Sequence, residues 1–173
     1  MLLHKRGCTI KKLLIICALI IAPALYAEDG VVVDFHGFSW GTSIQEFTAK
    51  IGNPVYAEDY DGLRSLVYDD IAVSGYPVFM LAYFSENGLE GGTYYFHTFN
   101  REELMRCYTD IQTELLARYG STNHRDGISR EMRLFETSWD LPSGLIYLKV
   151  DTRNNEPLIL WYSSPALTRK LSL

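Results

Sequence analysis

Apolar residues recur at helical spacing in a short segment, 43–51, and both of its ends carry residues that begin or end helices. Ser43 can accept a hydrogen bond from an early backbone N–H, and the carboxylate of Glu46 can reach back toward the cap, which makes a capping box. Gly52 can adopt the left-handed conformation that ends a helix, and Pro54 prevents continuation. The pattern predicts a helix whose apolar face is formed by Ile44, Phe47 and Ile51.

A second, longer helix is predicted over 101–119 by the same criteria. Asn100 is a favourable cap with Glu103 three residues on, and Gly120 follows the last apolar position. Cys107 lies at the edge of the apolar stripe, where a free cysteine acts as a small buried hydrophobe. The stripe itself is formed by Leu104, Tyr108, Ile111, Leu115 and Tyr119.

Six further segments are rich in branched and aromatic residues and have the character of strands. Asn87 and Gly88 suit a tight turn between the second and third of them. The polar stretches 55–63 and 121–131 are expected to be loops. The predicted strands are 64–70, 77–85, 89–99, 132–140, 144–152 and 157–164.

The two halves of this pattern, about 41–97 and 99–164, match each other. Each has a helix that ends in glycine, then a polar stretch and three strands, and an offset of about 67 residues aligns them. The aligned residues are Phe79 with Ile146, Leu81 with Leu148, Tyr83 with Val150, and Tyr94–Tyr95 with Trp161–Tyr162. Such a match predicts an internal repeat. We expect an α+β fold in which two αβββ repeats form one antiparallel sheet of about six strands, with two helices on one face.

The first 27 residues have the organisation of a signal peptide. A basic stretch precedes the apolar run 13–25, which is shorter than the roughly 20 residues that span a bilayer. Cleavage is expected after about Ala27, because Glu28 and Asp29 follow at once. Retention of the segment as a membrane anchor is the alternative. Residues 28–173 are then expected to form a single α+β domain, periplasmic or secreted, with no stable membrane span.

The net charge limits the possible partners, and the cysteine content indicates how the domain is stabilised. The chain has a net charge of −5, and removal of four cationic side chains with residues 1–27 leaves −5 − 4 = −9. A polyanion such as nucleic acid would be repelled, so no nucleic-acid partner is expected. Cys107 is the single cysteine of 28–173, which predicts a domain without an internal disulfide, stabilised by packing.

The segment 41–54, "GTSIQEFTAKIGNP", resembles the opening of the small bacterial envelope domains of the BamE/SmpA type. In these domains a polar loop, an aromatic strand and a hairpin follow, and "VYDD" (67–70) and "FSENGL" (84–89) occupy those places here. The resemblance covers about 41–97, and tandem copies of such a unit also resemble BLIP-like secreted β-lactamase inhibitors. It implies a non-catalytic envelope module that binds proteins, or a secreted enzyme inhibitor. The chain lacks the lipidation site of the first group and the cysteine pairs of the second.

Catalytic chemistry finds little support in the residues present. The histidines of 28–173, His36, His97 and His124, are scattered, and no serine lies in a nucleophile elbow. The acidic stretch 58–62 lacks the later oxygen ligands of a calcium loop, so no metal and no cofactor are expected. We therefore expect that the protein is not an enzyme. The rival hypothesis is an envelope-glycan hydrolase that uses paired carboxylates, for which the candidates are Asp69, Asp70, Glu86 and Glu136.

Aromatic residues are the remaining candidates for a binding site. On strands they alternate between two faces: one set must serve the core, and the other, unless edge loops cover it, would form a platform for another envelope or secreted protein. The predicted loop 121–131, which contains arginines, is expected to adjoin this surface. The residues predicted to bind are Tyr83, Tyr95, Trp139, Trp161, Arg125 and Arg130.

Overall fold

The computed structural model describes residues 31–97, 100–121, 124–129, 134–152 and 157–171, and the segment Val32–Leu173 is one compact unit. The expected leader, 1–27, and its cleavage site lie outside the described residues. The helices of this unit are α2 (Ile44–Ile51), α3 (Arg101–Tyr119) and α4 (Pro165–Leu171). The strands are β1 (Tyr56–Tyr60), β2 (Leu63–Val73), β3 (Tyr76–Ser85), β4 (Gly88–Phe96), β5 (His124–Ser129), β6 (Leu134–Leu141), β7 (Gly144–Asp151) and β8 (Leu158–Ser163).

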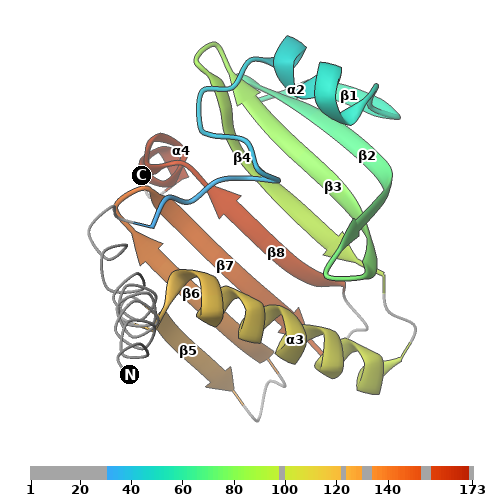
Figure 1. Cartoon of the computed structure of the whole chain (residues 1–173), viewed down its shortest axis with the longest axis vertical. Helices are drawn as coiled ribbons and strands as arrows, with labels where there is room; N and C mark the ends of the chain where they lie inside the picture. The colour runs from blue at the N-terminus through green and yellow to red at the C-terminus, as the bar shows by residue number, and fades with distance from the viewer. Residues whose placement is uncertain (1–30, 98–99, 122–123, 130–133, 153–156, 172–173) are drawn as a thin grey trace, which may run out of the picture. The chain divides into compact units, whose positions relative to one another are not determined.

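All eight strands belong to one antiparallel sheet in the order β1-β2-β3-β4-β8-β7-β6-β5 (Figure 1). The fold is of the α+β type, but the prediction of about six strands in two αβββ repeats is wrong. Each of α2 and α3 is followed by four strands, and the additional helix α4 closes the described chain. The strands that end the two runs, β4 and β8, pair in the middle of the sheet.

The two strands that sequence reasoning missed are the edges of the sheet. The stretches 55–63 and 121–131 were expected to be loops, but β1 and β5 lie there and pair with β2 and β6. An edge strand pairs on one side only and can be exposed on both faces, so it needs no apolar alternation. The sequence of β1, "YAEDY", is accordingly exposed at four of its five positions.

The proposed 67-residue offset fails for a geometric reason. Ile146 and Leu148 of β7 are completely buried, whereas their aligned partners Phe79 and Leu81 point to the other face of the sheet from the buried Val78 and Met80. Shifting a strand by one residue moves every side chain to the opposite face. The alignment therefore equates core positions with surface positions, and it does not describe a structural repeat.

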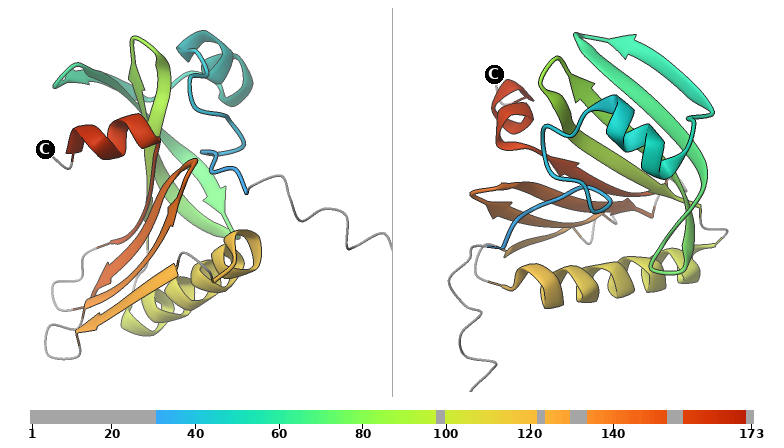
Figure 2. Two further views of the ribbon diagram at one scale, coloured as in Figure 1. Left: turned by 90° about the vertical axis from the view of Figure 1, so that its left-hand side faces the viewer. Right: turned by 45° about the horizontal axis from the view of Figure 1, so that its top comes forward.

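The helices divide between the two faces of the sheet. Figure 2 (left) shows α2 and α3 on one side and α4 on the other. Neighbouring glycines of β4 mark the division, because a Cβ at Gly92 would meet the ring of Phe35, whereas one at Gly91 would meet the side chain of Leu167 in α4. Two helices cover one face, and a third helix, which was not predicted, packs on the other. None of the helices in the described ranges is both long and apolar enough to cross a bilayer.

The core lies between the sheet and α2, α3 and the segment 32–43. The predicted apolar stripe of α3 is buried along its whole length, and Cys107 is buried with it. Burial raises the pKa of the Cys107 thiol to about 12, so the group is protonated and unreactive at neutral pH. Phe47, the buried residue of α2, packs against Phe38 and Phe84 with ring centroids 4.5 and 5.3 Å apart.

The predicted cap at Ser43 and the end of α2 at Gly52 are confirmed, but Gly52 is not in the left-handed helical conformation that was predicted. The Ser43 side chain accepts a hydrogen bond of 3.2 Å from the backbone N–H of Glu46. At the other end, the N–H of Gly52 donates to the carbonyl of Thr48, and Gly52 has φ 108° and ψ −175°.

Replacing Gly52 with valine is expected to lower the free energy of unfolding by about 1–3 kcal/mol, because glycine alone adopts this backbone region readily. Apart from its chain neighbours, no atom lies within 4 Å of a Cβ built at Gly52, so the penalty is conformational rather than steric. Urea denaturation of the variant and the wild type measures the loss. An unchanged unfolding midpoint would contradict the assignment of Gly52 as the residue that ends α2.

Candidate functional sites

Three of the predicted binding residues lie together on the face of the sheet that carries α4. Tyr83, Tyr95 and Trp161 each sit between two buried core residues of their strands, so their side chains point away from α2 and α3. All three are half-buried. Four further aromatics share this side of the sheet, and we call the set the aromatic face: Tyr56, Tyr60, Phe79, Tyr83, Tyr95, Tyr147 and Trp161.

One row of the aromatic face crosses all eight strands. Strand register places its members directly opposite one another in the order Tyr56, Val67, Leu81, Thr93, Trp161, Tyr147, Ser138 and Arg125. Trp161 lies near the middle of the row, and the polar Ser138 and Arg125 end it on the β5 side. The neighbouring row contains Phe79, 42% exposed, opposite Tyr95. Helix α4 covers one end of this face, where Leu167 lies over Gly91.

The other three predicted residues are found in different places. Trp139 does not belong to the aromatic face, because its side chain is completely buried among core residues. Its indole N–H donates a 2.9 Å hydrogen bond to the carbonyl of Gly120. Arg125 is exposed at the end of the row just described. Arg130 lies outside the described residues.

The four carboxylates considered for hydrolysis lie on three separate elements. Asp69 and Asp70 are exposed where the register of β2 shifts, and Glu86 is exposed in the turn between β3 and β4. Glu136 is on β6, where it accepts a hydrogen bond from Tyr147. The strands β3, β4, β8 and β7 separate β2 from β6. Within the described ranges, no group of three or more His, Cys, Asp or Glu side chains could hold a metal ion.

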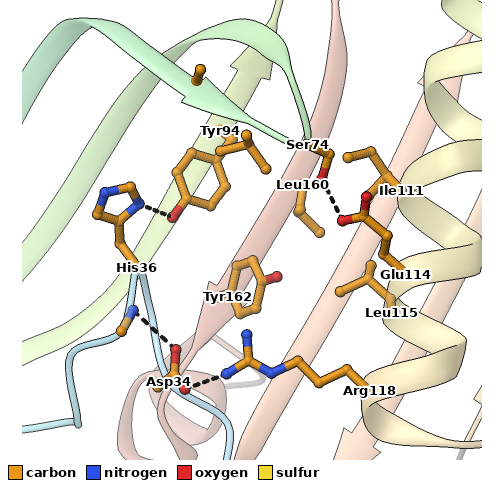
Figure 3. A pocket seen from close by; sticks show the side chains of 13 residues that line it. Asp34, His36, Ser74, Tyr94, Ile111, Glu114, Leu115, Arg118, Leu160 and Tyr162 are labelled. Atoms are coloured by element: carbon orange, nitrogen blue, oxygen red, sulfur yellow. Dashed lines mark hydrogen bonds and ion pairs between the residues drawn. The ribbon is translucent and has the colours of Figure 1, made fainter.

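A pocket that sequence reasoning missed lies on the opposite side of the sheet (Figure 3). It has a volume of about 370 Å³ and is lined by the segment 34–37, the end of β2, the turn after it, the strands β4 and β8, and α3. One wall is a tight hairpin in which Phe35 and Phe38 form a β-bridge. His36 and Gly37 at its tip have φ 56° and 78°, the two positive values of a type I′ turn. The motif "FHGF" is the sequence signal that could have located this wall.

Three contacts between side chains link the elements that line the pocket (Figure 3). Asp34 forms an ion pair of 2.5 Å with Arg118 of α3. The Nδ1 atom of His36 lies 2.9 Å from the hydroxyl of Tyr94, and the hydroxyl of Ser74 donates a 2.5 Å hydrogen bond to Glu114. The floor is apolar and aromatic and is formed by Ile111, Leu115, Leu160 and Tyr162.

Burial sets the protonation of the ring groups in the pocket. It lowers the pKa of His36, an effect that the neighbouring Asp34 opposes and Lys50 reinforces, and so favours the neutral imidazole. Burial also raises the pKa of Tyr94 well above its usual range and raises that of Tyr162. The acidic and basic side chains that line the pocket besides His36 are Asp34, Glu114 and Arg118.

No protein-family model matches the chain, and no curated protein sequence matches it. Among solved structures, the fold is similar to a cysteine-rich secretory protein from Staphylococcus aureus subsp. aureus Mu50, with a TM-score of 0.50, 11% identity and coverage of 84% of this chain and 51% of that one. A DUF4309 family protein from Bacillus subtilis subsp. subtilis strain 168 has a TM-score of 0.45, 11% identity and coverage of 73% and 80%. For an extracellular protein containing an SCP domain from Bacillus anthracis strain Ames the values are 0.44, 12%, and 83% and 52%.

The chain spans about half the length of the first and third of these proteins. At 11% identity, the likeness to the first concerns the fold alone. None of the three is described as a BamE-like protein or a β-lactamase inhibitor, and the resemblance over 41–97 stays a prediction. The similarity to solved structures thus identifies an arrangement of strands and helices that is known in other proteins.

Proposed function

We propose that this chain is a non-catalytic, extracytoplasmic module that binds another envelope or secreted protein through its aromatic face. The observation that carries the proposal is the row from Tyr56 to Arg125, with Trp161 near its middle. The solvent-facing side of an antiparallel sheet is ordinarily polar, whereas this one presents tyrosine, tryptophan and phenylalanine side chains. Such clusters are typical of protein interfaces, which have an apolar centre and a polar rim.

The type of partner follows from charge and location. A chain of net charge −5 does not attract nucleic acid, and an aromatic centre flanked by serine and arginine suits a protein surface. The signal-peptide pattern of 1–27 supports a location outside the cytoplasm. The described neighbours from Staphylococcus aureus and Bacillus anthracis are a secretory and an extracellular protein, which is in keeping with that location.

Photo-crosslinking tests the proposed surface. A photoreactive phenylalanine analogue at Phe79, which is exposed on the aromatic face, should crosslink residues 28–173 to one protein of the cell envelope or the secreted fraction. The same analogue at Gln45, which is exposed on α2 on the other side of the sheet, should not. Equal crosslinking from both positions would contradict the proposal.

Replacing Trp161 with alanine is expected to weaken capture of that partner at least about tenfold, because aromatic residues at the centre of an interface carry most of its binding energy. The control Gln45→Ala should retain wild-type affinity. Binding is measured by titration with the purified partner, after both variants are shown to remain folded by circular dichroism. A Trp161→Ala variant that binds as tightly as wild type would rule out the row as the contact. A captured enzyme whose activity falls on binding would identify the module as an inhibitor.

A further inference from the structure

The pocket behind the sheet is separate from the aromatic face, although neighbouring residues line the two. Tyr94 and Tyr162 line the pocket, and the adjacent Tyr95 and Trp161 point to the opposite side of the same two strands. A ligand in the pocket would therefore leave the proposed protein-binding surface free. The volume of about 370 Å³ is within the range of roughly 300–1,000 Å³ that small-molecule sites occupy.

The charges of the pocket disfavour an anionic ligand. Arg118 is paired with Asp34, and Glu114 accepts a hydrogen bond from Ser74. Two carboxylates face one guanidinium, so the formal charge of these side chains is −1 − 1 + 1 = −1 and an added anion is repelled. A neutral ligand is not repelled and does not break the ion pair.

The polar groups of the walls suit hydroxyl groups on the ligand. A hydroxyl can donate to the carboxylates of Asp34 and Glu114 and can accept from the guanidinium of Arg118. The hydroxyl of Tyr162 makes no hydrogen bond to the other residues drawn in Figure 3, and it adds a group that can donate or accept. The apolar floor of Ile111, Leu115 and Leu160 supplies contact for the C–H groups of a ring.

We infer that this pocket binds a neutral, hydroxyl-rich ligand of about one sugar ring. Its aliphatic face would rest on the apolar floor, and its hydroxyls would bond to the walls that Asp34, Glu114 and Arg118 form. The pocket and the aromatic face are independent sites, so a negative result at one does not contradict binding at the other.

Nuclear magnetic resonance titration of the ¹⁵N-labelled protein tests the inference with matched sugars. Glucose, galactose and N-acetylglucosamine are the neutral probes, and glucuronate is the anionic counterpart of glucose. At least one neutral sugar should shift the backbone amides of His36, Gly37, Ser74 and Arg118, and glucuronate should bind at least about tenfold more weakly. Neutral sugars that leave these amides unshifted would overturn the inference, as would glucuronate that binds equally tightly.

Two conservative variants locate the binding. Tyr162→Phe removes the hydroxyl but keeps the ring, and it should weaken the binding of the neutral sugar about 3- to 10-fold. Tyr95→Phe makes the same change on the aromatic face and should leave the affinity unchanged. The dispersion of the amide spectrum shows that each variant is folded. Equal loss in both variants, or unchanged affinity in Tyr162→Phe, would overturn the pocket as the place of binding.

Discussion

Replacing Trp139 with alanine is expected to lower the free energy of unfolding by about 3–5 kcal/mol, the range for a large buried aromatic side chain. Trp139 has no exposed surface, and its ring centroid lies 5.1 Å from that of His124. Its indole N–H is the hydrogen-bond donor to the carbonyl of Gly120, directly after α3. The substitution would thus leave a cavity between β6 and α3 and an unpaired carbonyl at the end of that helix. Urea denaturation measures the loss.

The matched control is Trp161→Ala, which removes the same side chain from a half-buried position on the aromatic face. It should cost less stability than Trp139→Ala, because fewer packing contacts are lost and no hydrogen bond to the backbone is involved. The opposite order of the two losses would show that the assignment of these tryptophans to core and surface is wrong. This comparison also separates a binding defect in Trp161→Ala from a folding defect.

The two tryptophans show what alternation in a strand sequence can and cannot predict. Alternation divides the residues of a strand into two sets that point to opposite faces of the sheet, but it does not say which set is buried. In β6 the buried set includes Thr137, so the core side of the strand does not look apolar. Thr137 is accommodated because its hydroxyl lies 2.5 Å from that of Tyr108 in α3 and donates to Asp126. This network joins residues from distant parts of the chain, which explains why Trp139 was predicted on the wrong face.

The helices were predictable because their signals are local. Ser43 and Asn100 each cap a helix through a hydrogen bond three residues away, and glycine follows each helix. The pocket was not predictable in this way. Its ion pair joins Asp34 and Arg118 across 84 positions of sequence, and its walls come together only when the segment 32–43 crosses the sheet. Sequence patterns thus identified the elements, and tertiary contacts decided where a cavity formed.

The second large loss of stability is expected on replacement of Phe35, which lies in the segment that crosses the sheet. Phe35 is completely buried, with its ring stacked on Tyr94 at 4.9 Å and lying 5.8 Å from that of Tyr162. Phe35→Ala is expected to lower the free energy of unfolding by about 3–5 kcal/mol. Because Phe35 precedes His36 in the hairpin, loosening it should also displace one wall of the pocket. Denaturation and the amide shifts of residues 34–38 measure the two consequences.

Gly92 provides the partner for a double-mutant cycle that tests this contact directly. A Cβ at Gly92 would lie 2.1–2.5 Å from three carbon atoms of the Phe35 ring, so Gly92→Ala alone should cost about 1–3 kcal/mol by forcing the ring aside. In the Phe35→Ala background the clash is absent, and alanine in the strand should instead stabilise by about 0.5–1 kcal/mol. The same substitution is therefore expected to change sign with its background, a coupling that distant residues do not show. Additive effects would mean that Phe35 does not rest on Gly92, and the hairpin wall of the pocket would have to lie elsewhere.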